Sequence, residues 1–343
     1  MNLSKIKTIY VYCLANVVTG GCELLHQLVH VLNIKGYDAY IVYVGDNGVI
    51  PSEYAKYKIN VAKQVCDEET SLIVLDEGFL YKAKEYKKAH LMFWWLSVDN
   101  FYCDDGQINF LSFFDLFRWN RRLAYKVYKK KIIRLIKYFD CPDRTFSLRD
   151  LKRISAINAY QSEYARLFLN SRGFKNVISL SDYINLDFIN DLECKKEPIV
   201  LYNPRKGFEF TKKLMAFAPD LQWIPIQNYS REQLISLLKR SMVYIDFGNH
   251  PGKDRLPREA ALCGCCVVTG NMGSAKNSID IPIPAKYKFR NLDCDIKNVI
   301  NQLYYILNHY EECKSDFASY VDIIKGEKEK FLLDVDAIFD REF

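Results

Sequence analysis

The sequence lacks the segments that mark secreted and membrane-spanning proteins. The start, Met1–Lys7, is short and polar and lacks an apolar region that leads to a small-residue cleavage site, so we expect no secretory signal. The sequence contains no run of about 18 uninterrupted apolar residues, so we expect no helix that spans a bilayer. Both absences favour a cytoplasmic protein, which can still lie on the inner face of a membrane.

Low-complexity tracts and Gly/Ser-rich linkers are also absent. Of the 343 residues, 49% are apolar and 26% are charged, which is an ordinary globular composition. A chain of this length is too long for a single hydrophobic core and fits two domains of about 150 residues each. We therefore predict two folded domains.

The cysteines do not form a disulfide framework. Eleven of them are scattered through predicted strands and helices, which favours free thiols in a reducing compartment. The group Cys263, Cys265 and Cys266 lies in the apolar run Ala260–Val268 without a second pair of ligands. We interpret these three as small buried side chains and expect no zinc site.

One segment concentrates positive charge, although the net charge of the chain is only +6. An aromatic run at Phe110–Phe117 precedes it, so residues 110–137 fit an anionic membrane surface. A solvated basic helix whose apolar residues face the core fits equally well. Nucleic acid binding is a weaker interpretation, because no recognisable nucleic-acid module accompanies the charge. The cations, with no acid among them, are Arg118, Arg121, Arg122, Lys126, Lys129, Lys130, Lys131, Arg134 and Lys137.

The first half of the chain alternates strands and helices. The apolar run Ile9–Leu14 predicts a buried strand, and a loop with Gly20 and Gly21 leads to a helix at Cys22–Lys35. A strand at Ala39–Val44 completes a unit that is typical of parallel sheets. Further strands are predicted at Ser71–Leu75, His90–Leu96, Ser155–Ala159 and Val177–Leu180, and a helix at Ser162–Ser171.

The second half repeats this pattern after a boundary near Leu186–Lys196. The predicted strands are Pro198–Tyr202, Trp223–Ile226, Met242–Phe247 and Cys265–Thr269, and the predicted helices are Phe208–Ala218, Ser230–Arg240 and Leu256–Cys263. The fold class is therefore α/β, with two Rossmann-like doubly wound domains that face a central cleft. We predict the domains at residues 1–188 and 189–325, and a C-terminal helix at 326–343 that crosses back.

Three segments place binding groups at the carboxyl ends of strands. Gly20 and Gly21 let the backbone approach a ligand at a helix start, although they lack the GxGxxG spacing of a dinucleotide site. Arg205 and Lys206 follow a strand and precede a helix, where two cations fit a diphosphate. In the third segment, residues 246–270, Glu259 lies near the start of an apolar helix, where a carboxylate can accept two hydroxyl hydrogen bonds, as from a ribose.

The order of these motifs resembles the GT-B glycosyltransferases, and within them the large retaining family of polysaccharide and lipopolysaccharide sugar transferases. The resemblance spans residues 9–290. It implies that Gly21 and its neighbours approach the diphosphate of a nucleotide sugar, that Arg205 and Lys206 neutralise it, and that Glu259 holds the ribose. Tyr229 would border the base. The motifs that carry the resemblance are Gly20-Gly21, Ser162-Glu163-Tyr164-Ala165, Lys206-Gly207, Glu259-Ala260, Gly264 and Val267-Val268.

One position departs from the family pattern. The family has a second Glu eight residues before the ribose-binding one, where it contacts the donor sugar, and this chain has Pro251 there. We expect His250 and Lys253 to supply the missing sugar or phosphate contacts, His250 as a catalytic residue. The remaining predicted donor-site residues of this loop are Asn249, Gly252 and Arg255.

A further acid is predicted to act in the first domain. Asp99 follows an apolar strand, and a comparable acid or His in the resembled family faces the reacting carbon. It would stabilise an oxocarbenium-like transition state or deprotonate the acceptor; the alternative is a turn or helix cap. Asp104 and Asp105 have the pattern of turn residues, and we expect neither a metal ion nor a cofactor.

The resulting hypothesis is sugar transfer from a nucleoside-diphosphate donor to a surface-glycan, polysaccharide or lipid-linked acceptor. A sugar-nucleotide epimerase shares this architecture, and so does a non-catalytic nucleotide-sugar-binding protein that has lost the second Glu. Both stay open as alternatives at this point.

Overall fold

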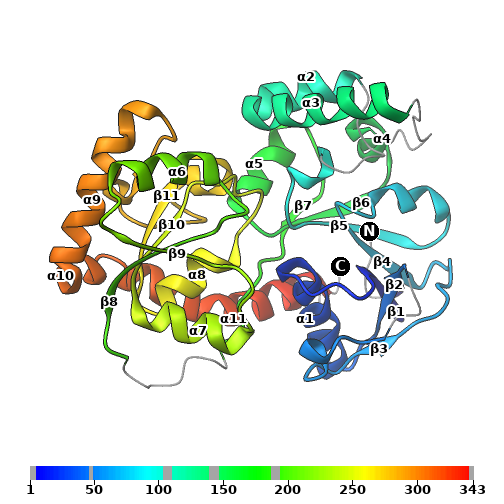
Figure 1. Cartoon of the computed structure of the whole chain (residues 1–343). Helices are drawn as coiled ribbons and strands as arrows, with labels where there is room; N and C mark the ends of the chain where they lie inside the picture. The colour runs from blue at the N-terminus through cyan, green and yellow to red at the C-terminus, as the bar shows by residue number, and fades with distance from the viewer. Residues whose placement is uncertain (1–4, 46–48, 103–109, 139–146, 187–193, 340–343) are drawn as a thin grey trace. The chain divides into compact units, whose positions relative to one another are not determined.

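The computed structural model describes residues 5–45, 49–102, 110–138, 147–186 and 194–339. The chain divides into two compact units (Figure 1): unit 1 comprises Met1–Asp182 with Glu329–Phe343, and unit 2 comprises Tyr183–Lys328. The predicted turn residues Asp104 and Asp105 lie outside the described residues.

Unit 1 is built on a parallel sheet of seven strands in the order β3-β2-β1-β4-β5-β6-β7. The order runs outward from β1 in one direction and from β4 in the other, so the topological switch point lies between these two strands. The strands are β1 (Thr8–Leu14), β2 (Asp38–Val44), β3 (Asn60–Val61), β4 (Ser71–Asp76), β5 (His90–Trp95), β6 (Ala156–Tyr160) and β7 (Val177–Ser179).

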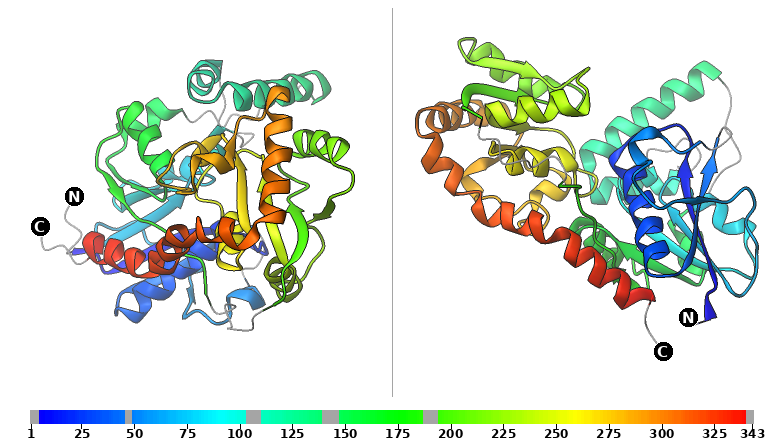
Figure 2. Two further views of the ribbon diagram at one scale, coloured as in Figure 1. Left: turned by 90° about the vertical axis from the view of Figure 1, so that its left-hand side faces the viewer. Right: turned by 90° about the horizontal axis from the view of Figure 1, so that it is seen from below.

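Helices cover both faces of this sheet, as Figure 2 shows. One face carries α1 and the end of α11, and the other carries α2 to α5. Short 3-10 helices occur at Ser52–Tyr54, Leu80–Glu85 and Asn100–Tyr102. The helices are α1 (Gly20–Ile34), α2 (Phe110–Trp119), α3 (Arg121–Tyr138), α4 (Leu148–Arg153), α5 (Glu163–Ser171) and α11 (Ala318–Phe339).

Two adjacent tryptophans in β5 contact the helices on both faces of the sheet, because successive side chains of a strand point to opposite faces. Trp94 stacks with Phe331 of α11, at 6.4 Å between ring centroids, and its indole N–H donates to Leu180 O at 2.9 Å. Trp95 packs against Phe168 of α5 at 5.9 Å. Both rings are fully buried, so the sequence Trp94-Trp95 anchors a helical layer on each side of the sheet.

Unit 2 has a parallel sheet of five strands in the order β12-β11-β10-β8-β9. Here the switch point lies between β8 and β10, which pair directly. The strands are β8 (Glu197–Tyr202), β9 (Gln222–Pro225), β10 (Ser241–Asp246), β11 (Cys266–Gly270) and β12 (Lys288–Phe289).

The helices of unit 2 also lie on both faces of the sheet, with α6 and α9 on one and α7 and α8 on the other (Figure 1). Short 3-10 helices occur at Gly273–Lys276, Ala285–Tyr287 and Asp293–Asp295. The α-helices are α6 (Phe208–Phe217), α7 (Arg231–Arg240), α8 (Arg255–Leu262), α9 (Ile296–Asn308) and α10 (Tyr310–Ser315), followed by the first part of α11.

The doubly wound α/β class is confirmed, and so are the ten strands predicted from the sequence, to within one or two residues at their ends. The buried, free thiols of Cys263, Cys265 and Cys266 are confirmed as well. The two-residue strands β3 and β12 were not predicted. In the described part of the chain, no helix is both long enough and apolar enough to cross a bilayer.

The basic segment is two helices, with a break at Asn120 that the sequence analysis did not predict. The Asn120 side chain accepts a hydrogen bond from Leu123 N at 3.1 Å, as an N-cap does. Asn120 N donates to Leu116 O at 2.6 Å, so the residue closes α2 and opens α3.

The two turns at the switch point of unit 2 touch backbone to backbone. Gly207, at the N-cap of α6, has φ +66°, and a Cβ there would lie 2.3 Å from Phe247 C. A Cβ on Gly248 would lie 2.5 Å from Lys206 Cβ. Only glycine fits both places, so the turn after β8 is held directly against the turn after β10.

Replacing Gly207 by alanine should destabilise the protein strongly, because the new Cβ meets backbone atoms and the left-handed φ is strained. We expect a loss of at least about 2 kcal/mol in the free energy of unfolding, measured by urea denaturation. The control is Gly326→Ala in α11, where nothing lies within 4 Å of the new Cβ. It should gain about 0.5–1 kcal/mol. Equal effects of the two substitutions would contradict the tight contact.

Candidate functional site

The candidate site lies at the carboxyl edge of the unit 2 sheet, where β8 and β10 diverge. Lys206 belongs to the turn after β8, and Asp246 ends β10. In doubly wound sheets, ligands bind outside the carboxyl ends of the strands at such a switch point. The Gly207 contact therefore sets Lys206 beside the residues that follow β10.

Four ionisable side chains form a cluster there. Lys206 Nζ lies 2.7 Å from Asp254 Oδ2, and His250 Nδ1 lies 2.8 Å from the same oxygen. His250 Nε2 is 3.6 Å from Asp246 Oδ1. Tyr244 OH donates to the other oxygen of Asp246 at 2.9 Å. Two carboxylates are thus held by two basic groups in a largely enclosed space.

The pKa values in the cluster follow from this pairing. Burial alone would raise the pKa of Asp254, but the hydrogen bond from His250 and the Lys206 ammonium lower it to about 2. Burial alone would lower the pKa of His250, and the charges of Asp246 and Asp254 outweigh burial and raise it. Burial also opposes the charge of Lys206, and the same two carboxylates raise its pKa. The cluster is therefore a charge-balanced network.

The same residues satisfy the distance requirement of a metal centre. Ligand atoms of Asp246, His250 and Asp254 lie within 4.8 Å of one another. Lys206 Nζ, however, already contacts the Asp254 carboxylate, and a divalent ion would have to displace it. The contacts among these residues are those of an ion-pair network.

Glu259 is held by two arginines. Its carboxylate is buried, and Oε1 lies 2.8 Å from Arg231 Nη2 and accepts from Arg255 Nη2 at 3.1 Å. Burial would raise the pKa of Glu259, and the two guanidinium groups outweigh burial and lower it. Arg231 comes from α7 and Arg255 from α8, so the carboxylate joins the starts of two helices.

A third cluster fixes the loop before α8. Arg258, whose side chain is fully buried, has Nη1 2.6 Å from Glu327 Oε2, and Lys253 Nζ lies 2.6 Å from Glu327 Oε1. The guanidinium also donates to Lys253 O at 2.9 Å and to Asp254 O at 3.2 Å. The loop that carries Asp254 is therefore tied to α11.

These clusters place positive charge where helices begin. Arg205 and Lys206 precede α6, Arg231 is the first residue of α7, and Arg255 is the first residue of α8. All three helices follow strands of one parallel sheet, so their N-termini share its carboxyl edge. A cation at a helix N-terminus is unfavourable by about 0.3–1 kcal/mol, whereas an anion there is stabilised. The edge is therefore suited to bind an anion.

The glycines predicted in unit 1 lie at its switch point. Gly20 and Gly21 are the first two residues of α1, and Thr19 caps the helix by accepting from Cys22 N. A Cβ on Gly21 would come no closer than 3.9 Å to Leu96 Cδ1. The backbone is thus not crowded there, which leaves the role of these glycines in donor binding a prediction.

Asp99 lies in a different environment from the one predicted for a catalytic residue. It is 1% exposed, and its Oδ1 accepts from Tyr164 OH at 3.0 Å and from Trp119 Nε1 at 3.3 Å. These contacts join α2 and α5 to the end of β5. They favour the interpretation of Asp99 as a structural acceptor, and its catalytic role stays a prediction.

The other predicted residues divide by exposure. Arg205 is exposed and Tyr229 is 42% exposed, so both are open to a ligand. Asn249 is half-buried, whereas Gly252 is buried, with its carbonyl accepting from Ser274 Oγ at 2.6 Å. The His250 ring is fully buried, so it does not face solvent.

Several ionisable residues near the carboxyl ends of the strands in the two units were not predicted. Arg231, Asp246, Asp254 and Glu327 belong to the clusters of unit 2. In unit 1, Glu77 is 5% exposed and accepts from Leu96 N at 3.0 Å; burial and then Asp76 raise its pKa to about 8. Asp246 and Glu77 come at or just after the end of a buried strand, and this position could have marked them as candidate site residues. Glu327 lies within a helix, where no such pattern distinguishes it.

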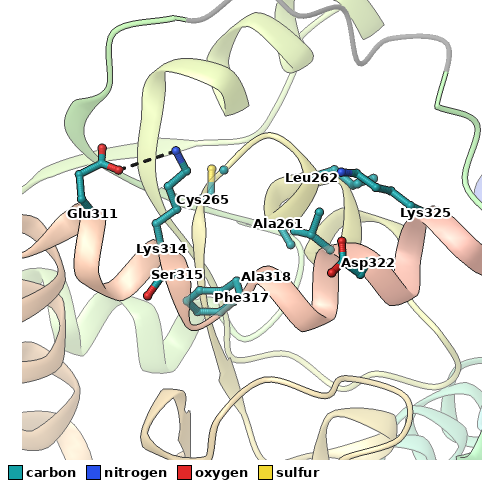
Figure 3. Close-up of a pocket in the computed structure, with 12 residues that line it drawn as sticks. Ala261, Leu262, Cys265, Glu311, Lys314, Ser315, Phe317, Ala318, Asp322 and Lys325 are labelled. Atoms are coloured by element: carbon teal, nitrogen blue, oxygen red, sulfur yellow. Dashed lines mark ion pairs between the residues drawn. The ribbon is translucent and has the colours of Figure 1, made fainter.

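A hollow of about 450 Å³ lies elsewhere on unit 2, at the C-terminal end of α8 (Figure 3). Its wall is formed by α10 and α11, with Lys314 pointing toward Glu311 at 3.8 Å. None of the predicted site residues lines it. The candidate site is thus the cationic edge and not this hollow.

Comparison with known proteins supports the same fold. No family model and no curated protein sequence matches the chain. Sucrose-phosphate synthase from Thermosynechococcus elongatus is structurally similar, with a TM-score of 0.63, 14% identity, and 97% of this chain and 98% of that chain covered. Anabaena HepE in complex with UDP and glucose has a TM-score of 0.59, 11% identity and coverage of 98% and 97%.

WaaG, a glycosyltransferase involved in lipopolysaccharide biosynthesis, has a TM-score of 0.52, 12% identity and coverage of 96% and 99%. At these identities, the comparisons show the fold. The chain has the GT-B fold, with two Rossmann-like units.

Removing the Glu327 carboxylate should destabilise the protein, because the enclosed Arg258 loses its partner. For Glu327→Ala we expect a loss of about 3–5 kcal/mol, measured by urea denaturation. The control is Glu329→Ala, an exposed position on the same helix, which should change stability by less than about 0.5 kcal/mol. A Glu327→Ala protein as stable as the control would show that the cluster does not fix the loop.

Proposed function

We propose that the protein is a glycosyltransferase that binds a nucleoside-diphosphate sugar at the carboxyl edge of unit 2. The observation that carries the proposal is the cationic edge: arginines and a lysine at the starts of α6, α7 and α8. In this proposal Arg205 and Lys206 neutralise the diphosphate, and Glu259 accepts hydrogen bonds from the ribose hydroxyls. Tyr229, which is partly exposed, borders the base.

The proposed reaction breaks the bond between the anomeric carbon and the diphosphate oxygen. The acceptor hydroxyl oxygen forms the new bond to that carbon and releases its proton to solvent, and the nucleoside diphosphate leaves as an anion. Negative charge grows on the leaving oxygen, where fixed cations stabilise the transition state more than the ground state. Because Arg and Lys can supply this stabilisation, the proposal requires no metal ion and no cofactor.

The acceptor is proposed from chemistry and from the neighbours. WaaG takes part in lipopolysaccharide biosynthesis, and HepE was solved with UDP and glucose. We therefore propose a UDP-type donor and a surface-glycan, polysaccharide or lipid-linked acceptor, with the enzyme on the cytoplasmic side. Asp99 already accepts from Tyr164 and Trp119, and His250 is held by Asp254, so neither is proposed as the group that receives the acceptor proton.

Two alternatives share the donor site. A sugar-nucleotide epimerase would convert the donor without any acceptor, and a non-catalytic binding protein would bind the nucleotide without turnover. Product analysis separates them: a released nucleoside diphosphate with a glycosylated acceptor supports transfer.

The donor site is tested by thermal shift and titration calorimetry with UDP-, GDP-, ADP-, TDP- and CMP-linked sugars. We expect one nucleotide class to stabilise the protein. Arg205→Ala should weaken its binding about tenfold or more, because it removes a charge-assisted contact to the diphosphate. Glu259→Ala should do the same through the ribose contact.

Two exposed residues outside the edge serve as controls, Lys297→Ala for the arginine and Glu329→Ala for the glutamate. They should leave nucleotide affinity within about twofold of the wild type. If no nucleotide sugar binds the wild type, or if both site variants bind as the controls do, the donor site is not at this edge.

We also propose that the first turns of the basic segment, within residues 110–137, contact an anionic membrane surface. Leu116 and Ala124 are buried, while Phe114, Phe117, Tyr125 and Tyr128 are exposed among basic residues. Exposed aromatics interleaved with cations suit a membrane interface, where rings enter the headgroup layer and cations meet anionic lipids. The exposed cations are Arg118, Arg121, Arg122, Lys126 and Lys129. A nucleic acid would bind the same cations.

The membrane contact is tested by flotation with phosphatidylcholine vesicles that contain or lack phosphatidylglycerol. We expect binding only to the anionic vesicles, and release by salt. Lys126→Gln with Lys129→Gln should weaken binding about tenfold or more, at about 1 kcal/mol for each charge. Lys63→Gln with Lys297→Gln is the matched control. Equal binding by both double variants, or binding to neutral vesicles, would contradict the proposal.

A further inference from the structure

The side chains of Lys206, Asp254 and His250 differ in their exposure to solvent. The Lys206 side chain is 33% exposed and that of Asp254 is 19% exposed, whereas the His250 side chain has no exposed surface. A ligand at the cationic edge can therefore reach Lys206 but not the His250 ring. His250 can act on the ligand only through a neighbour.

That neighbour is Asp254. Its Oδ2 atom is shared by Lys206 Nζ at 2.7 Å and His250 Nδ1 at 2.8 Å. A diphosphate that takes Lys206 as its partner removes one of the two cations from this oxygen. The carboxylate is mostly enclosed, so it would lose stability unless the other cation stays.

We propose that His250, as an imidazolium, is a positioning residue that frees Lys206 for the diphosphate by keeping Asp254 neutralised. The inference rests on the proposed function, since it concerns the same donor site. With His250 neutral, Asp254 retains Lys206, and the diphosphate competes with this largely enclosed carboxylate for the lysine. With His250 charged, Lys206 moves at little cost.

The surroundings of His250 determine the direction of the pH dependence. The groups that face it are Asp246 from β10, Asp254 from the loop before α8, and Lys206 from the turn after β8. Tyr244 donates to the Asp246 carboxylate, and Ser274 contributes a backbone N–H that donates to His250 O. The two carboxylates raise the pKa of His250 against the effect of burial, and the Lys206 cation lowers it.

When Lys206 moves to the diphosphate, its lowering effect weakens and the pKa of His250 rises further. Binding therefore takes up a proton at pH values between the pKa of the free protein and that of the complex. Affinity is highest below the pKa of His250 in the free protein, and it falls as the pH rises through that value. Because one proton is taken up, the affinity cannot change by more than about tenfold per pH unit.

The experiment is calorimetric titration of the full chain between about pH 6 and about pH 9. The probe is UDP-glucose or the diphosphate sugar that the donor screen selects. A diphosphate diester has no ionisation near pH 6, unlike a terminal phosphate, so the diphosphate itself contributes no slope. We expect about tenfold weaker binding at the upper end, together with proton uptake that is measured in two buffers of different ionisation enthalpy.

Two variants should change the affinity in opposite directions. His250→Gln cannot be charged, so binding should be about tenfold weaker at pH 6 and independent of pH. Asp254→Asn no longer retains Lys206, so at the upper pH it should bind about tenfold tighter than the wild type. A purely structural role for the cluster predicts instead that both variants weaken binding.

The wild-type pH series does not depend on whether His250→Gln folds. Binding that is independent of pH in the wild type, or equal weakening in both variants, overturns the inference and leaves the proposed function standing. The absence of nucleotide-sugar binding at every pH overturns both.

Discussion

The backbone contact between the turns after β8 and β10 is the constraint on which the candidate site depends. Gly207 and Gly248 leave no room for a Cβ, so the turns meet without side chains between them. This close approach sets Lys206 beside Asp246 and the loop that follows it. The strands themselves pair in parallel at the switch point, and the position of the charges follows from that pairing.

Charge at this edge is organised at two depths. The carboxylates of Asp254, Glu259 and Glu327 are largely or fully enclosed, and each binds two basic groups. Partly exposed cations remain at the surface, at helix starts where positive charge is unfavourable without an anion. The internal pairs tie the loops of the edge together, and the surplus of positive charge suits the edge to an anion. The position of the edge and its charge thus come from different members of one network.

Local signals account for what the sequence could predict. Apolar runs bounded by Gly or by a Ser cap predicted ten strands and five of the helices between them, and Lys206 and Glu259 were recognisable beside strand and helix ends. The two-residue strand β3 depends on pairing with β2, and such a pairing leaves no local signal. The same holds for Arg231 and Glu327, because neither position reveals which carboxylate or cation it meets. The burial of His250 and Asp99 also depends on packing from distant segments.

The measurement that tests the central claim most directly is a crystal structure of the protein with a bound nucleoside-diphosphate sugar. The account predicts diphosphate density against the start of α6, with Lys206 turned from Asp254 to the phosphate oxygens and His250 still on Asp254. Ribose density should lie against Glu259. Nucleotide density in the hollow beside α10 and α11, or a Lys206 that stays on Asp254 in the complex, would contradict it.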